Sequence, residues 1–147
     1  MKYVFDAERI SNWVCEKAGG AYQPNYTAIG IEKNGVLQAA FIYHTFTGEN
    51  GSIVMGGRCD NKFSTTRLFY AMAFNYPFEQ LGVKRINSLI KKSNKDAFAI
   101  NKNLGFIQEH IVKDYFPNED GIFFQMYQKD CRFLKGKYAL ALQNINR

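Results

Sequence analysis

The sequence predicts an α/β fold with one mixed sheet, and three observations support this class. Apolar residues recur at helical spacing in three segments, three β-rich stretches follow one another across short turns, and a strand, a helix and a strand come next. A chain of 147 residues can bury roughly 70% of its unfolded surface in one domain. We therefore expect a single domain over 1–147, ordered as helix, three strands, helix, strand, helix and two strands.

The first helix is predicted over residues 7–18. Its apolar residues lie on one helical face: Ile10, Trp13 and Val14. Asp6 is a suitable N-cap, and the two glycines after residue 18 end the helix.

The chain then changes to β-branched and aromatic residues. Three stretches have this composition: Tyr26–Glu32, Val36–Phe46 and Ser52–Arg58. The segments KNG and TGENG separate them, and such short turns join antiparallel neighbours. We predict a three-stranded meander.

Helical spacing returns from Ser64 and continues to Leu81, with Gly82 as the C-terminal cap. Pro77 should kink this helix, because it removes a backbone hydrogen bond and crowds the carbonyl four residues earlier. Val83–Ile90 is the next predicted strand, and a right-handed crossover would place it parallel to the strand before the helix.

The last elements are a helix over 94–103, a strand over Phe106–Phe116 and a hairpin partner over Ile122–Lys129, joined across PNEDG. From Asp130 the tail is predicted to be a short helix with a frayed end. The sequence contains no internal repeat or interdomain linker.

Charge and cysteine content narrow the class of protein. Nineteen Lys and Arg against thirteen Asp and Glu give a net charge of +6, which suits an anionic partner such as a phosphorylated cofactor or nucleic acid. A basic, solvated surface is the alternative interpretation. Three widely spaced cysteines form neither a disulfide framework nor a metal pattern, and no stretch approaches 18 apolar residues. We expect a soluble protein of a reducing, cytoplasmic compartment.

The stretch SNKDAFAINKNLGF begins with an apparent capping box, in which Ser93 and Asp96 satisfy the first backbone N–H groups of the helix. Asn94 is then not needed as the cap. Gly105 supplies the left-handed residue that ends the helix, and the inward positions are Ala97, Ile100 and Leu104.

A second helix start, CDNKFSTTRLF, is suited to a phosphate. Backbone N–H groups over 63–66 would face the anion together with three hydroxyls and two basic side chains: Ser64, Thr65, Thr66, Lys62 and Arg67. A plain Ser/Thr cap beside a solvated lysine is the alternative.

With these elements in place, the sequence resembles the GNAT superfamily of acetyl-CoA-dependent N-acetyltransferases. Asn94, Ala97, Ile100 and the ending Leu104-Gly105-Phe106 match a family pattern, and the order of elements agrees over about residues 5–130, which leaves 131–147 as a tail. The resemblance implies a mixed, mostly antiparallel sheet of six or seven strands flanked by helices, with a splayed central strand pair.

Within the superfamily, the chain looks most like a group of small proteins encoded by phages and prophages. It shares their signatures Thr66-Arg67, Tyr76-Pro77-Phe78, Gln80-Leu81-Gly82-Val83 and Cys131-Arg132-Phe133-Leu134. This similarity implies a viral or mobile-element source, and therefore action in a host cytoplasm.

The resemblance also implies where acetyl-CoA binds. Val54, Met55 and Gly56 would line the opening beside the pantetheine arm, and Asn94 would hydrogen-bond the cofactor. The pyrophosphate signature is altered, because Lys62 stands at its basic position while Phe63, Thr65 and Arg67 stand where glycines are usual. Charge and hydroxyls would compensate, from Lys62, Ser64, Thr65 and Thr66, with three lysines toward the ribose phosphate: Lys91, Lys92 and Lys95.

Asn101 stands where family members commonly have the tyrosine that protonates the departing thiolate. An amide cannot release a proton, so Tyr115 and Tyr127 are possible substitutes. The attacking ammonium must also lose a proton, and His44 and Glu49 are the nearest candidate bases, each with an ordinary structural role as its alternative.

The sequence therefore predicts an acyltransferase that moves an acetyl group from acetyl-CoA to a primary amine. Two alternatives stay open: a GNAT-fold binding module that has lost catalysis and contacts a host protein, and a nucleic-acid-binding domain. The loops Gly19–Asn25 and Phe116–Gly121 would select the acceptor, and a dimer is possible.

Overall fold

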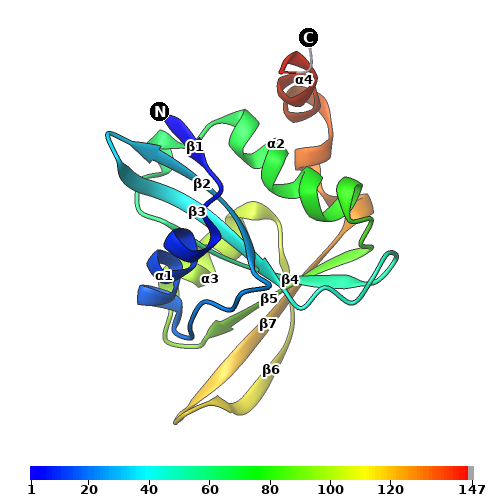
Figure 1. Ribbon diagram of the computed structural model, residues 1–147. Helices are drawn as coiled ribbons and strands as arrows, with labels where there is room; N and C mark the ends of the chain where they lie inside the picture. The colour runs from blue at the N-terminus through cyan, green and yellow to red at the C-terminus, as the bar shows by residue number, and fades with distance from the viewer. Residues whose placement is uncertain (146–147) are drawn as a thin grey trace.

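One seven-stranded sheet organises residues 1–145, which are the part of the chain that this computed structural model describes (Figure 1). The strand order is β1-β2-β3-β4-β5-β7-β6, and among these strands only β4 and β5 run parallel. The strands are β1 Lys2–Val4, β2 Thr27–Lys33, β3 Val36–His44, β4 Ser52–Cys59, β5 Arg85–Lys91, β6 Ile107–Phe116 and β7 Glu119–Tyr127. The helices are α1 Ala7–Ala18, α2 Arg67–Asn75, α3 Lys95–Leu104 and α4 Gly136–Asn144.

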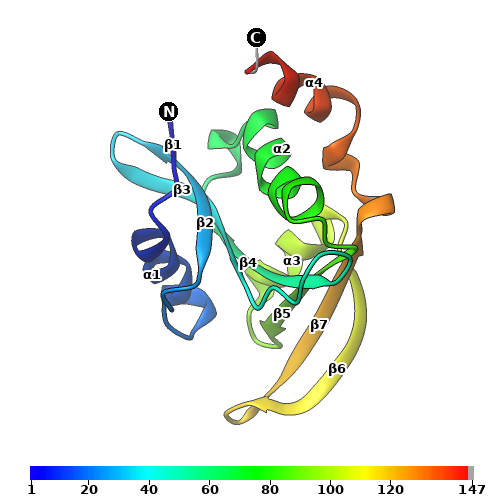
Figure 2. The ribbon, with the colours of Figure 1, turned by 45° about the vertical axis from the view of Figure 1, so that its right-hand side comes forward.

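Helices cover both faces of the β2–β4 meander. On one face, Ile10 and Val14 of α1 pack against Ala40 and Ile42 of β3. On the other face, the alternate β3 side chains join Phe69 and other apolar residues of α2 in the larger core. Figure 2 shows α1 on one side of this meander and α2 with α4 on the other. The β3 run AAFIY is continuously apolar because both faces of the strand are buried.

The predicted meander and parallel crossover are confirmed, with strand ends shifted by one or two residues. One strand was missed: β1 has three residues, too few for a period-2 pattern, and pairs antiparallel with β2. The predicted loop PNEDG is shorter than expected, because β7 already begins at Glu119 and leaves Pro117 and Asn118 as the turn.

Both helix-end predictions around α1 are confirmed. The Asp6 side chain accepts a hydrogen bond from the Arg9 amide at 3.1 Å, and Gly19 follows the helix with φ of 81°. Only glycine adopts this conformation without strain.

The helix predicted from Ser64 to Leu81 is divided into three parts. A 3₁₀ turn covers Lys62–Ser64, α2 covers Arg67–Asn75, and one π-helical turn covers Tyr76–Gln80. Pro77 lies in the π turn, in agreement with the predicted disruption, because proline lacks the N–H that an α-helix would use there.

The tail continues the main core. Cys131 and Phe133 are buried, and the Phe133 ring stacks on Phe74 of α2 at 4.7 Å between centroids. Helix α4 then packs on α2 (Figure 1). The predicted frayed end falls partly on residues 146 and 147, outside the described residues. Within residues 1–145, no helix is long and apolar enough to cross a membrane.

Candidate active site

The two parallel strands at the centre of the sheet separate after three residue pairs. Ser52, Ile53 and Val54 of β4 are in register with β5, and the pairing stops there. On its other edge, β4 stays paired with β3 as far as Cys59. The edge of β4 that faces β5 is therefore without a strand partner beyond Val54, which confirms the splayed central pair.

A narrow slot of about 50 Å³ occupies the gap between the splayed strands. Its walls come from β3, β4 and β5, the end of α1, and α3 with its flanking residues: Ala18, Phe41, Met55, Gly56, Gly57, Ser88, Leu89, Ile90, Lys91, Asn94, Ala97, Ile100, Asn101, Leu104 and Phe106. Met55, Gly56 and Asn94 are thus brought together as predicted. Val54 forms the last strand pair, at the vertex where the strands part.

The slot adjoins a larger cleft of about 610 Å³, with Phe41, Ile100 and Leu104 lining both. The far wall of this cleft is the end of β4 and the segment after it, residues 58–63, and the opposite wall includes Asp96 of α3 and Arg132 of the tail. Its volume lies within the range of about 300–1,000 Å³ that is usual for small-molecule sites. Slot and cleft therefore share a wall.

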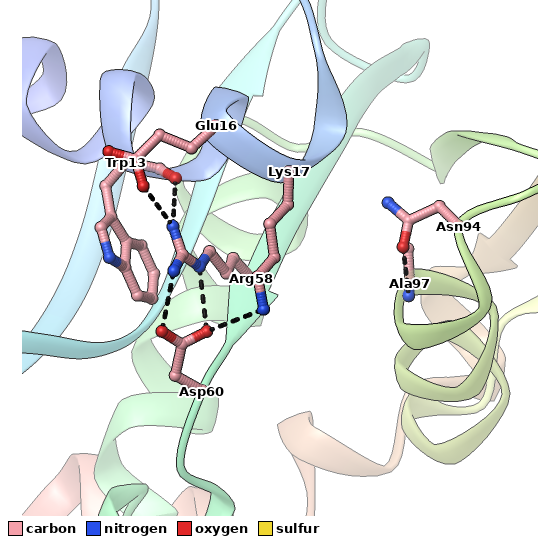
Figure 3. Close-up of polar contacts among 7 residues, drawn as sticks. All are labelled: Trp13, Glu16, Lys17, Arg58, Asp60, Asn94 and Ala97. Atoms are coloured by element: carbon pink, nitrogen blue, oxygen red, sulfur yellow. Dashed lines mark hydrogen bonds and ion pairs between the residues drawn. The ribbon is translucent and has the colours of Figure 1, made fainter.

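Asn94 is the N-cap of α3, so the predicted capping box of Ser93 and Asp96 is wrong. The Asn94 side-chain oxygen accepts a hydrogen bond from the Ala97 amide at 3.1 Å (Figure 3). Ser93 lies one residue too early for this role, and its amide donates instead to Glu119 Oε1 at 3.0 Å. The cap uses only the Asn94 oxygen, and its amide nitrogen points away from the helix and remains a donor at the slot.

The turn before α2 is held by its own polar side chains. Asn61 caps the 3₁₀ turn by accepting a hydrogen bond from the Phe63 amide at 3.1 Å, and its Nδ2 donates to Ser64 Oγ at 3.0 Å. Ser64 is buried and also bonds Gln38 of β3. The Ser64 hydroxyl therefore anchors the turn to the sheet.

The hydroxyls of the two threonines that follow also form hydrogen bonds within the protein. Thr65 Oγ1 donates to the Lys62 carbonyl at 2.7 Å, whereas Thr66 Oγ1 caps α2 by accepting from the Phe69 amide at 3.0 Å. The Tyr3 hydroxyl lies 2.7 Å from the same Thr66 oxygen. None of Ser64, Thr65 and Thr66 lines the cleft, so their side chains shape the turn.

Lys62 and Phe63 are the members of this turn that line the cleft. The Phe63 ring is 86% exposed, and the Lys62 ammonium lies 5.4 Å from its centroid. The amides of Phe63, Ser64 and Thr65 already have acceptors. Among residues 1–145, the amides without an acceptor at this helix start are those of Thr66, Arg67 and Leu68. Lys95 is exposed at the first turn of α3 and lines neither cavity.

Asn101 is buried and lines the slot, and its Nδ2 donates to the Ala97 carbonyl at 2.8 Å. Tyr115 and Tyr127 are exposed and line neither cavity. The structure therefore brings to the slot the amide that cannot supply a proton, and leaves both suggested tyrosines outside it.

His44 lies one strand from the vertex, because it pairs with Val54, which in turn pairs with Asn87 of β5. Its ring stacks on Tyr26 at 4.6 Å, and its Nδ1 is 2.9 Å from Thr45 Oγ1. Burial lowers the pKa of His44, which favours the neutral imidazole at pH 7. Glu49 instead sits in the exposed β3–β4 turn against Gly82.

Ser88 is a slot residue that the sequence analysis missed. It is buried on β5 between Ile86 and Ile90, at an inward-facing position. A single hydroxyl in an otherwise apolar strand face was the signal that could have identified it.

The architecture is that of known acetyltransferases. A variant of the spermidine N-acetyltransferase SpeG from Vibrio cholerae aligns over 88% of this chain and 96% of its own, with 13% identity and a TM-score of 0.66. A GNAT-family acetyltransferase from Bacillus anthracis aligns over 84% and 86%, with 13% identity and a TM-score of 0.59. RimJ from Mycobacterium smegmatis, in complex with CoA-disulfide, aligns over 83% of this chain and 61% of its own, with 18% identity and a TM-score of 0.58.

No protein-family model and no curated protein matches the sequence. The likeness is therefore one of fold, and it confirms the prediction of a GNAT fold with a seven-stranded, mostly antiparallel sheet.

Proposed function

We propose that this chain is an N-acyltransferase that uses acetyl-CoA to acetylate a primary amine. The observation that carries the proposal is the parting of β4 and β5 after Val54, which leaves an unpaired β4 edge leading into a cleft at the start of α2. An extended arm can add to such an edge as a strand would.

The residues of the site fit acetyl-CoA in shape and charge. Met55 and Gly56 would flank the pantetheine arm, and the Asn94 amide nitrogen would donate to it. Lys62, which lines the cleft, would meet the phosphates, and the amides without an acceptor at the nearby start of α2 would add the helix dipole, which favours anions. When bound, acetyl-CoA supplies an acetyl group activated as a thioester.

His44 would remove the proton of the incoming ammonium through a water molecule, since it is a neutral imidazole on the residue that pairs with Val54 at the vertex. Backbone N–H groups of β4 beyond Val54 would stabilise the negative charge that develops on the carbonyl oxygen. Attack by the neutral amine would form the C–N bond first, and the C–S bond would break when the tetrahedral adduct collapses, with the sulfur leaving as a thiolate. A thiol pKa of about 8.5 makes the departing thiolate tolerable without a general acid, which agrees with Asn101 in the slot.

The acceptor would approach beside Lys91, where two loops meet. The Lys91 ammonium lies 2.9 Å from where a Cβ of Gly19 would be, and 5.8 Å from the centroid of the Phe116 ring. Ala18, just before the first of these loops, lines the slot. The loops over 19–25 and 116–121 thus remain our proposal for the acceptor-selecting segments.

A binding module without catalysis is the second candidate, and the specific observation that favours it is Asn101 at the usual position of the acid. In that case the chain would bind CoA and contact a host protein. A phage or prophage source and a cytoplasmic location belong to both proposals and rest on the sequence resemblance.

Binding of CoA tests the proposal first. At a CoA concentration of one hundred times Kd, the melting temperature should rise by about 5 °C or more. Lys62→Glu should weaken binding about tenfold, because it places a negative charge where phosphate binds. Lys33→Glu, at the exposed end of β2 away from the cleft, is the matched control and should bind normally.

Release of free thiol from acetyl-CoA across a panel of amines then separates the two candidates. Absence of stabilisation by millimolar CoA would refute both. Binding without thiol release would favour the inactive module, and a strong, salt-dependent affinity for DNA or RNA would point to the nucleic-acid-binding domain.

A further inference from the structure

Arg58, near the end of β4, is a charged side chain that is only 13% exposed. Its Nε and Nη2 donate to the two carboxylate oxygens of Asp60, each at 2.9 Å. Its Nη1 donates to the Trp13 carbonyl and to Glu16 Oε2, both at 2.8 Å (Figure 3). The guanidinium carbon also lies 4.1 Å from the centroid of the Trp13 ring.

These contacts join α1, which lines the slot, to the segment that lines the cleft. Trp13 and Glu16 belong to the last turns of α1, which ends at Ala18 in the slot. Asp60 begins the segment that becomes the 3₁₀ turn and the start of α2, and Lys17 adds a second ion pair to it at 3.4 Å. The Arg58 guanidinium lowers the pKa of Asp60, which keeps that carboxylate charged.

Arg58 faces the cleft, but within the described residues four of its five N–H groups donate to protein acceptors. Nε, Nη1 and Nη2 all have protein acceptors, and a planar fork of this kind holds its partners in one fixed arrangement. A phosphate would have to break these bonds to use the same donors. Arg58 therefore acts on the ligand site through Asp60 and α1.

We propose that Arg58 is a positioning residue, which holds α1 and the 58–66 segment in the arrangement that receives the phosphates of the cofactor. That this cofactor is acetyl-CoA rests on the proposed function. Phe63, Thr65 and Arg67 stand where the resemblance would place glycines in this loop, so a cross-link from the sheet to α1 orders the segment instead.

Arg85 is a matched control for this cluster. Its Nη2 bonds Glu109 at 3.0 and 3.2 Å, its Nε bonds Asn87 at 2.7 Å, and it lies 5.6 Å from the Tyr127 ring. The side chain is 29% exposed and lines neither the slot nor the cleft. It therefore has the same types of partner in another place.

The experiment compares Arg58→Lys, Arg58→Gln and Arg85→Gln by thermal unfolding, calorimetry with CoA and fluorescence of Trp13, the single tryptophan of the chain. Arg58→Gln should weaken CoA binding about tenfold or more and shift the Trp13 emission. Arg58→Lys should bind CoA more tightly than Arg58→Gln but more weakly than the wild type, because one ammonium cannot bridge Asp60 and α1 together. Arg85→Gln should lose stability but bind CoA within about twofold of the wild type.

Wild-type affinity in Arg58→Gln, or an equal loss of affinity in Arg85→Gln at equal stability, would overturn the proposal. If Arg58→Gln does not fold, Asp60→Asn breaks the same link more gently and should show the same weakened binding. Hydrogen exchange of amides 59–66 tests the link without ligand: faster exchange in Arg58→Lys than in Arg85→Lys is expected, and equal exchange would refute it. Failure of the wild type to bind CoA would refute the proposed function instead.

Discussion

Substitutions of Asn94 should separate stability from cofactor binding, because its side chain offers two different groups. The oxygen caps α3 through the Ala97 amide at 3.1 Å, and the nitrogen is a donor at the slot. Asn94→Ala removes both groups. Asn94→Asp keeps the oxygen and removes the donor.

The cap sets the expected change in stability. Loss of a capping side chain costs about 1 kcal/mol, so Asn94→Ala should lower the melting temperature by about 3 °C in a chain of this size. Asn94→Asp should match or slightly exceed wild-type stability, because a carboxylate at a helix N-terminus gains about 0.3–1 kcal/mol from the dipole.

The donor sets the expected change in affinity. A net hydrogen bond of about 1 kcal/mol corresponds to about fivefold weaker CoA binding in Asn94→Ala. The loss should be larger in Asn94→Asp, which also places a negative charge beside an anionic ligand. Circular dichroism melts and calorimetry with CoA measure the two quantities on the same samples.

Two results would refute this reasoning. Undiminished CoA affinity in Asn94→Asp would mean that the amide nitrogen does not bind the cofactor. An unchanged melting temperature in Asn94→Ala would mean that α3 does not depend on this cap.

Three further predictions concern the slot, pH and thiol reactivity. Gly57→Ala should destabilise the protein by about 1–3 kcal/mol, because its Cβ would lie 2.8 Å from the Phe41 ring, whereas Gly56→Ala, whose nearest contact is Ile42 at 3.4 Å, should cost less than about 1 kcal/mol; equal denaturation midpoints would contradict this. Burial lowers the pKa of His44 in the folded protein. The contribution of His44 to stability is therefore complete above the ordinary pKa of about 6.5 and is lost as the pH falls from there through the folded-state pKa. In urea titrations, His44→Gln should lose less stability than the wild type between about pH 7.5 and 5.5, and equal losses would argue against this linkage. Burial raises the pKa of the Cys131 thiol to about 11, and this fully buried group should resist a disulfide reagent at about pH 8 until the chain unfolds; a Cys131→Ala variant with the same native-state labelling would identify Cys15 and Cys59 as the reactive thiols.

Patterns within a few residues of one another were predictive here. The Asp6 cap, the glycines that end α1 and α3, and the disruption at Pro77 are each decided by the local backbone, and each is confirmed. The capping box failed within the same range, because Ser93 and Asn94 are both good caps and differ by one residue. Glu119, from the β6–β7 hairpin, takes the Ser93 amide and leaves Asn94 as the cap.

The sequence by itself determined the order of the elements after β1 and the parallel crossover, because periodicity and turn residues act locally. Tertiary structure alone decided which polar side chains around the site have hydrogen-bond partners within the protein. Thr66 meets Tyr3, Ser64 meets Gln38, and Arg58 meets α1, across separations of 26 to 63 residues. Hydrogen-bond partners of this kind depend on how distant segments pack, and no local pattern encodes them. The same packing places His44 beside the vertex of the splayed strands, at a strand end that the sequence shows only as polar.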